Sequence, residues 1–259
     1  LMLTVHLSVI LNKNLPEIDY AAIEQKADQA TRSASGSMLA LFSEKIENMV
    51  VSSADLSNSD KTEGFLKNSK PFKKGDFSGG FLHAGVSELT MACIMNGMAL
   101  HGGIIPVCGT FFVFSDYMKP AFRMSALMRQ QVIYVWTHDA FRVGEDGPTH
   151  QPVEHELQVR LMEALKNHKG KNSMLVLRPA DVDETTVAWK MALENQDTPT
   201  ALILSRQNVK NLPRKESKYN EALGATKGAY IVKDCEGTAD VILLASGSEV
   251  STLVAATEL

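Results

Sequence analysis

The sequence predicts an α/β protein: a doubly wound, mostly parallel sheet with helices on both faces, followed by an incomplete second α/β domain. Two observations predict this class. Short apolar runs rich in Val, Ile and Leu recur along the chain, and a stretch of helical periodicity separates each run from the next. The runs are continuous and do not alternate with polar residues, which is typical of strands buried on both faces.

The chain divides into three parts. We expect residues 1–20 to form a linker and helical lead-in, and residues 21–213 to form one α/β domain. Residues 214–259 should form a linker and the truncated start of a second α/β domain. The boundary lies in the charged stretch Lys210–Lys218, which contains Pro213. The first residue is not Met, so we expect a piece of a longer protein.

Four elements are expected in the first 103 residues. Helical periodicity predicts a helix from Ile18 to about Ile46, and Met49–Val51 has the composition of a short buried strand. Residues 57–80 are polar and rich in Ser, Lys and Gly, so we expect a surface loop there. A second helix should run from Glu88 to about Leu100 and end at the pair Gly102-Gly103.

Strands and helices then alternate. Strands are expected at 104–107, 132–136, 174–177 and 201–204, with helices at about 115–128 and 153–165 and a third that carries Trp189. Ser115 or Asp116 should cap the first of these helices, and Asp181 or Asp183 the third. Beyond the boundary we expect strands at 229–232 and 241–244 and a helix capped by Ser248.

Composition excludes several classes of protein. The chain has 259 residues, of which 44% are hydrophobic, so it can bury a sizeable core. A net charge of −4 gives no basic footprint for nucleic acid, and no apolar stretch reaches the roughly 18 residues that cross a bilayer. The 3 cysteines form no Cys-x-x-Cys pair, so we expect a reducing compartment and a cytoplasmic protein.

The residues that follow the predicted strands suggest where a ligand binds. In a doubly wound sheet, ligands bind beyond the carboxyl ends of the strands. Because loops are generally polar, Asp139 and Arg178 there need no function, but paired histidines in a glycine-rich loop are less expected. The side chains at this edge are Ser53, Asp55, Ser59, Thr110, Phe111, Phe114, His138, Asp139, Asp146, His150, Arg178 and Arg206.

The loop from His138 to Pro152 is the most informative stretch. Two glycines and two prolines give it an irregular path, so its side chains can be aimed at a ligand. A metal site is an alternative, since His138, His150, His155 and nearby carboxylates are ligand types. Their spacing does not match a zinc helix of the His-Glu-x-x-His kind, so we expect no metal ligands in this chain.

Several blocks together resemble the pyrimidine-binding middle domain of the transketolase family, in the family's order from about Asp28 to Leu259. Gly144–Pro152 (Gly-Glu-Asp-Gly-Pro-Thr-His-Gln-Pro) is the most specific. Ser87 and Leu89 around Glu88, and residues 140–143, depart from the common family pattern. The other blocks are Ala30–Arg32, Ser52–Leu56, Gly85–Glu88, Asn96–Gly102, Gly109–Tyr117, Thr137–Asp139 and Leu204–Asn208.

The resemblance implies the thiamine-diphosphate-binding fold and transfer of a two-carbon ketol unit from a ketose phosphate to an aldose phosphate, as in the pentose phosphate pathway. Glu88 matches the acid that hydrogen-bonds the aminopyrimidine ring and so activates the cofactor. Phe114 matches the aromatic side chain that stacks on this ring, with Phe111 and Tyr117 around it. Asp55 matches a residue near the thiazolium. Taken alone, Glu88 is an ordinary helix-start glutamate.

The resemblance also implies how sugar phosphates are held. Arg32, Ser59, His138 and Arg206 match the phosphate-binding set, and arginines suit phosphate because they bind it through two hydrogen bonds. Asp146 matches the acceptor for a substrate hydroxyl. His150 matches a histidine that bonds the transferred unit and assists proton movement.

The family's diphosphate-binding motif does not occur in this chain. Mg²⁺ (or Ca²⁺) is therefore expected only in the full-length enzyme, on a domain that these residues do not include. The resemblance further implies a homodimer with each active site between two subunits, and a chain that is inactive alone. Two alternatives stay open: a related thiamine enzyme, such as deoxyxylulose-phosphate synthase or a formaldehyde transketolase, and a non-catalytic homologue.

Overall fold

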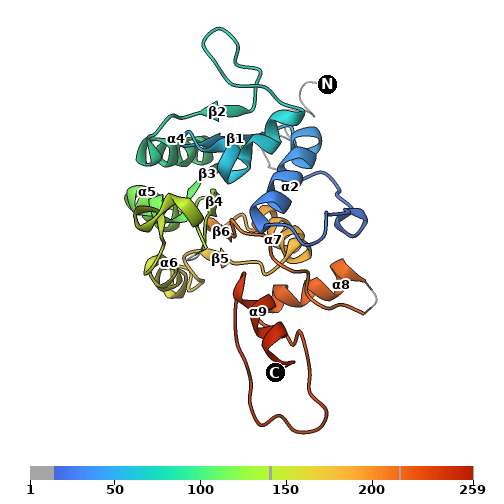
Figure 1. The fold of residues 1–259 in the computed structure, drawn as a ribbon. Coiled ribbons are helices and arrows are strands. Elements are labelled where there is room, and N and C mark those ends of the chain that lie inside the picture. Colours follow the sequence, from blue (N-terminus) through green and yellow to red (C-terminus); the bar gives the residue numbers. More distant parts are fainter. Residues whose placement is uncertain (1–14, 140–141, 216, 259) are drawn as a thin grey trace.

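The computed structural model describes residues 15–139, 142–215 and 217–258. Within these ranges it contains a parallel sheet of six strands in the order β2-β1-β3-β4-β6-β5 (Figure 1). The predicted parallel α/β class is therefore confirmed. The strands are β1 (Met49–Ser53), β2 (Phe81–His83), β3 (Ile105–Phe111), β4 (Ile133–Thr137), β5 (Leu175–Leu177) and β6 (Thr200–Leu204).

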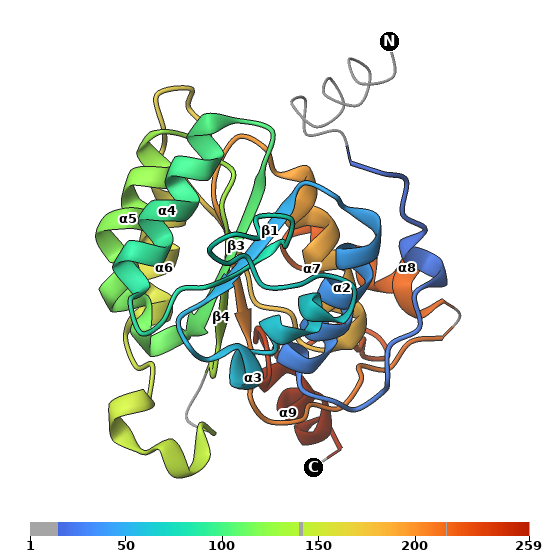
Figure 2. The same ribbon diagram turned by 90° about the horizontal axis from the view of Figure 1, so that it is seen from above.

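Helices cover both faces of the sheet, as predicted. Figures 1 and 2 show α4 (Glu88–His101), α5 (Ser115–Leu127) and α6 (His155–Ala164) on one face. On the other face lie α2 (Thr31–Lys45) and α7 (Val182–Glu194). None of the helices in the described ranges has the length and apolarity needed to span a membrane.

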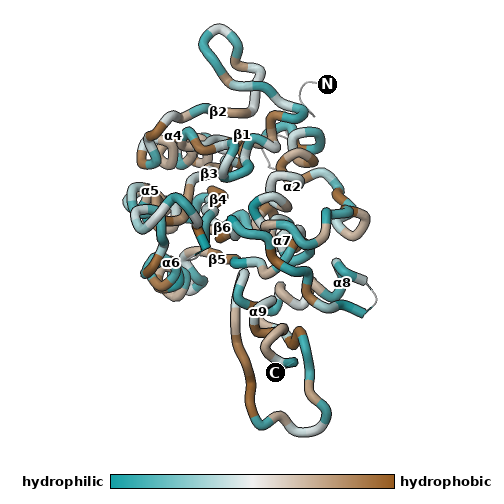
Figure 3. Tube along the Cα trace, viewed as in Figure 1, coloured by the Kyte–Doolittle hydropathy of each residue, from teal (hydrophilic) through white to brown (hydrophobic). Residues whose placement is uncertain are grey.

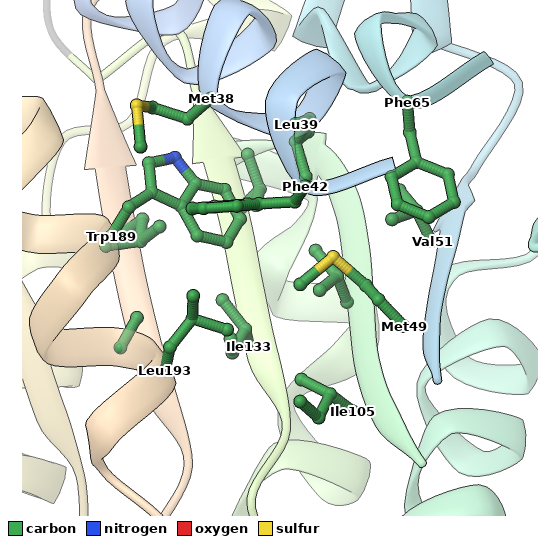
Figure 4. Packing of buried hydrophobic residues seen from close by; sticks show 14 of the residues in the cluster. Met38, Leu39, Phe42, Met49, Val51, Phe65, Ile105, Ile133, Trp189 and Leu193 are labelled. Carbon is green, nitrogen blue, oxygen red and sulfur yellow. The ribbon is translucent and has the colours of Figure 1, made fainter. Parts of the chain in front are cut away.

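Strand β4 is apolar at successive positions because its side chains enter a core on each face of the sheet. Ile133 and Val135 point into the core under α2 and α7, where Trp189 meets Phe42 edge-on with ring centroids 5.4 Å apart (Figure 4). Tyr134 and Trp136 point into the core under α4, α5 and α6. Because both faces are covered, every position of the strand is buried.

The predicted first helix begins too early. Of its expected range from Ile18 to Ile46, only Thr31–Lys45 forms α2, and η1 (Tyr20–Ala22) is a single 3₁₀ turn. Asp28 has a left-handed φ of 54°, and the Ala30 N–H donates to Asn208 Oδ1 over 3.1 Å. Tertiary hydrogen bonds to the segment after β6 therefore replace helical ones. Residues 1–14 of the expected lead-in lie outside the described residues.

The expected surface loop at 57–80 is only partly a loop. Its first part forms α3 (Ser57–Asp60) and η2 (Thr62–Lys67), which bury Asp60 and Phe65. Gly64 makes this packing possible, because a Cβ there would lie 2.2 Å from the Gly36 carbonyl oxygen in α2. The rest projects beyond β2, a short edge strand that its sequence did not indicate (Figure 1).

Two caps differ from expectation and one agrees. Phe114 takes the N-cap position of α5, and neither Ser115 nor Asp116 caps this helix. Ser248 takes the N-cap position of α9 (Glu249–Ala256), but its hydroxyl donates to the Glu249 side chain and caps no backbone N–H. Asp181 caps α7 as predicted, accepting from the N–H groups of Asp183 and Glu184.

The strands predicted at 229–232 and 241–244 do not form. Between η6 (Leu223–Lys227), which follows α8 (Lys218–Ala222), and α9, the chain makes an extended loop whose apolar residues Ile231 and Val241–Leu244 are exposed. Figure 3 shows this hydrophobic stretch on the projecting loop. A strand needs a neighbour for its N–H and C=O groups, and none of the described strands pairs with these residues.

Candidate active site

Most of the residues singled out from the sequence meet at the carboxyl edge of the sheet. Parallel pairing places the ends of β1, β3, β4 and β6 side by side, so the segments that follow them become neighbours. Residues that are far apart along the chain thereby form two groups: an aromatic group around Phe111 and Phe114, and a charged group around Arg32 and Arg206. His138 joins the two.

The aromatic group follows β3. Phe111 ends the strand, and Phe114, in the turn η3 (Phe112–Phe114), stacks on it with ring centroids 5.9 Å apart and planes at 8°. Tyr117 in α5 lies 6.1 Å from Phe114 and is exposed. Phe111 is buried, so Phe114 and Tyr117 offer the accessible flat surface. Phe112 and Phe122 are buried in the core.

Glu88 lies beside this aromatic group. It begins α4, is only 8% exposed, and its Oε1 accepts a hydrogen bond of 3.4 Å from the Thr110 hydroxyl. Thr110 directly precedes Phe111, so the carboxyl group lies at the end of the same strand. Of its apolar neighbours, Val86 is 81% exposed and Leu89 is also exposed. The sheet and helix α4, and not these two side chains, therefore shield Glu88.

His138 links the aromatic and charged groups. Its ring is buried and stacks on Phe111 at 3.6 Å, and its Nδ1 lies 2.9 Å from the Thr137 hydroxyl. Its Nε2 lies 3.5 Å from Arg32 Nη1, so the bonding pattern assigns the proton to Nδ1 and leaves Nε2 as an acceptor. Burial, and then the charges of Arg32 and Arg206, lower the pKa of His138 to about 3.

Arg32 is held in place from the opposite segment. Its Nη1 donates to the Ser59 carbonyl oxygen over 2.7 Å, so Ser59 contributes its backbone to the group. Burial, and next the charge of Arg206, lower the pKa of Arg32, which Asp146 and Asp60 oppose. The two guanidinium groups thus repel one another, and an anion bound to both would reduce this repulsion.

The loop after β4 brings its acidic residues to the same place. Asp146 Oδ2 lies 4.0 Å from His138 Nε2 and 4.0 Å from Arg206 Nε. Arg206 also donates to both carboxylate oxygens of Glu145, at 3.0 and 3.1 Å. Gly144 has a φ of 87°, which favours glycine, and a Cβ there would lie only 3.1 Å from Arg206 Nη1. Ala140 and Phe141 of this loop lie outside the described residues.

His150 faces the aromatic group. Its ring lies 5.2 Å from Phe114 and 6.0 Å from Phe111, close to edge-on in both cases. Its Nδ1 lies 2.9 Å from the Thr149 hydroxyl. Asp55 follows β1 at the same edge with a left-handed φ of 64° and is exposed. The contacts of the described residues join neither Asp55 nor the Ser59 hydroxyl to the two groups.

Sequence reasoning missed Asp60 and Glu145, and it gave Arg178 no function although Arg178 follows a predicted strand at this edge. Asp60, the residue after Ser59, is fully buried and accepts from the Ser53 hydroxyl at 2.6 Å and from the Thr62 N–H at 2.8 Å. Burial raises its pKa to about 6 against these hydrogen bonds. The sequence carries no signal for this carboxylate, because it lies in a stretch that reads as a polar loop.

The expectation of no metal ligands in this chain stays a prediction, and the alternative stays open at His155, one of the three histidines it named. Within the described residues, the group with donor atoms close enough for an ion consists of Asp116, Glu154 and His155. There the His155 Nε2 already donates to Asp116 Oδ2 over 3.1 Å. His138 and His150 contact the aromatic group, and His138 also contacts the charged group.

Comparison with known proteins gives a consistent result. Residues 27–211 match the family described as the transketolase pyrimidine-binding domain, and residues 228–259 match the transketolase-like C-terminal domain. A transketolase of Halalkalibacterium halodurans is 50% identical over 230 residues, covering 88% of this chain and 32% of the relative. The chain thus spans about a third of the length of this relative.

Solved structures agree. A transketolase from Leishmania mexicana superposes with a TM-score of 0.84 at 38% identity, over 98% of this chain and 36% of that one. A Pichia stipitis transketolase structure, described as a complex with xylulose 5-phosphate, superposes with a TM-score of 0.86 at 35% identity. The match covers 99% of this chain and 37% of that one.

Proposed function

Since the chain belongs to the transketolase family, we propose that it carries the pyrimidine side of a thiamine diphosphate site. Its residues would serve the transfer of a two-carbon ketol unit from a ketose phosphate to an aldose phosphate. One observation carries the proposal: the buried Glu88 and the stacked pair Phe111–Phe114 lie at the end of the same strand.

The residues present fit this cofactor. Phe114 offers a half-buried flat face to a planar heteroaromatic ring, and Tyr117 borders it. Thr110 is the hydrogen-bond partner of the Glu88 carboxyl within the described part of the chain, which leaves Oε2 for a ring nitrogen. When bound, thiamine diphosphate supplies the carbon nucleophile that these reactions need. Glu88 would hold the shared proton at the ring nitrogen.

The charged group would bind and orient the sugar phosphate. Arg32 and Arg206 would hold the phosphate, with the Ser59 segment beneath Arg32. Neutral His138 can accept a hydrogen bond from a substrate hydroxyl at Nε2, and Asp146 lies 4.0 Å away to accept a second. His150 lies beside Phe114, where it can contact the transferred unit and move a proton. Asp55 is proposed to approach the thiazolium.

The finer assignments are proposals of the same kind. We propose that residues 21–213 form the pyrimidine domain and that the segment from 214 begins the C-terminal domain. The diphosphate and its Mg²⁺ would be held by a part of the enzyme that these residues do not include. The active site would then lie between two subunits of a homodimer, acting in the cytoplasmic pentose phosphate pathway.

The deciding experiment replaces Glu88 by Gln in an enzyme of full family length that contains this chain. Transfer from xylulose 5-phosphate to ribose 5-phosphate should fall by more than about tenfold, or roughly 1.4 kcal/mol of barrier, because the amide cannot take up and return the shared proton. Glu194→Gln, at the far end of α7, is the matched control and should keep full activity. Activity of the Glu88 variant within tenfold of the parent contradicts the role of Glu88.

The same assay separates the alternatives. A wild-type enzyme that accepts a different aldehyde or ketose but not this pair would belong to a related thiamine enzyme class. A non-catalytic homologue would give no transfer with any pair. The presence of Glu88, His138 and Arg206 at the same edge of the sheet favours ordinary transketolase activity over both alternatives.

A further inference from the structure

Arg178 follows β5 and connects segments that are otherwise separate. Its side chain is only 9% exposed. The Nε and Nη2 groups donate to Asp139 Oδ2 over 3.2 and 3.0 Å, and Nη1 lies 3.2 Å from Glu156 Oε2 in the first turn of α6. Nη2 lies 2.6 Å from Glu249 Oε2 in α9. One guanidinium therefore faces three carboxylates.

The turn before α9 is docked on this guanidinium. The Ser246 carbonyl accepts from Arg178 Nη1 over 3.2 Å, and the Gly247 N–H donates to the Arg178 carbonyl over 3.1 Å. Gly247 has a φ of 59°, and a Cβ there would lie 2.6 Å from Arg178 Nε. The backbone of the C-terminal segment thus packs directly against the arginine, with no space for a side chain.

The other end of this network is the residue next to His138. The Asp139 side chain is 1% exposed, and Arg178 neutralises its charge. His138 itself has a left-handed φ of 62°, which a residue with a Cβ adopts only where its surroundings hold it. A shift of the buried Asp139 carboxylate would therefore move the backbone that aims the His138 ring.

We propose that Arg178 is a positioning residue that couples docking of Ser246–Glu249 to the orientation of His138. Docked, the C-terminal segment fixes the guanidinium; the guanidinium fixes Asp139; and Asp139 fixes the strand end that carries His138. Undocking would remove the Ser246 carbonyl and the Glu249 carboxylate from Arg178, and the guanidinium could then turn toward Glu156. The role of His138 in substrate binding rests on the proposed function, but the coupling between Arg178 and His138 does not.

The test uses the 259-residue chain and two paired substitutions. Gly247→Ala should push the segment off Arg178, and Gly237→Ala is its control, because Gly237 also has a positive φ (85°) but open space around it. Arg178→Met removes the guanidinium, and Arg129→Met, at the amino edge of the sheet and paired with Asp197, is its control. The readouts are the His138 ring signals in NMR and amide exchange of residues 246–256.

Both test variants should shift the His138 signals and speed amide exchange of residues 246–256 by at least about tenfold, while both controls leave them unchanged. Faster exchange with unchanged His138 signals would overturn the coupling, and so would no change in either. If Arg178→Met fails to fold, Gly247→Ala decides, because its substitution lies in the peripheral turn. Neither readout requires turnover, so a failure of the proposed activity would not affect this result.

Discussion

The imidazole ring of His138 stacks on the ring of Phe111, with centroids 3.6 Å apart and planes at 28°. This contact joins the aromatic group that follows β3 to the charged group around Arg32. Register explains it, since Phe111 pairs with Thr137 across β3 and β4, one residue before His138. The stacked pair therefore lies where the two groups meet.

We predict that His138 stays neutral from pH 5 to 8. Burial and the neighbouring arginines lower its pKa from 6.5 to about 3. Protons therefore bind the unfolded chain more readily, so this histidine removes stability as the pH falls from 6.5 toward 3. Titration of the His138 ring signals by NMR measures this, with His138→Gln assigning them. A midpoint above pH 5 would refute the prediction.

Asp60 should make stability depend on pH in the opposite sense. Burial raises its pKa from 3.8 to about 6, so the folded chain binds the extra proton and loses stability as the pH rises through this interval. Asp60→Asn removes the charge, keeps an acceptor oxygen for Thr62 and places an amide N–H where the Ser53 hydroxyl can accept it. Between pH 4 and 7, the free energy of unfolding of the variant should rise relative to that of the parent. The rise should be about 3 kcal/mol at most, for a shift of roughly two pKa units.

Urea denaturation at several pH values checks the Asp60 prediction. Asp240→Asn, on the exposed C-terminal loop, is the matched control and should follow the parent at every pH. If the difference between Asp60→Asn and the parent does not change with pH, the carboxylate is not the group that titrates.

Removal of either arginine of the charged group should weaken phosphate binding. In an enzyme of full family length, Arg32→Met and Arg206→Met should each raise KM for a ketose phosphate by about 10- to 100-fold, because a hydrogen bond to a charged group contributes roughly 1.5–3 kcal/mol. A ketose without phosphate should be affected far less, and Arg129→Met should behave as wild type. Equal losses with both ketoses would show that the arginines do not bind the phosphate.

The contact between Gly64 and Gly36 makes a stability prediction. Gly64→Ala should lower the free energy of unfolding by about 1–3 kcal/mol, because its Cβ would overlap the α2 backbone. Gly97→Ala in α4 has open space and should raise this free energy by about 0.4–1 kcal/mol. Chemical denaturation of both variants compares them directly. A tolerated Gly64→Ala would mean that α2 and η2 can separate without cost.

The residues themselves determined every described strand of the central domain except β2, and most of its helices. β4 and β6 are apolar at nearly every position because both faces of the sheet are covered, and this composition is visible without coordinates. The same local signal failed for 229–232 and 241–244. Apolar residues favour a strand, but a strand exists only where another pairs with it, and that depends on distant parts of the chain.

Tertiary structure alone decided the order of the strands, the start of α2 and the partners of the site residues. The residue types at positions 138 and 206 could be picked out in the sequence because loops after parallel strands converge. Arg32 and Glu88 were indicated only by the resemblance to the transketolase family. The burial of Asp60, the left-handed backbone of His138 and the Arg178 network could not, because each arises from contacts between segments far apart in sequence. Local patterns specify which elements can form; the free energy of packing them together selects the neighbours that give each side chain its charge state and direction.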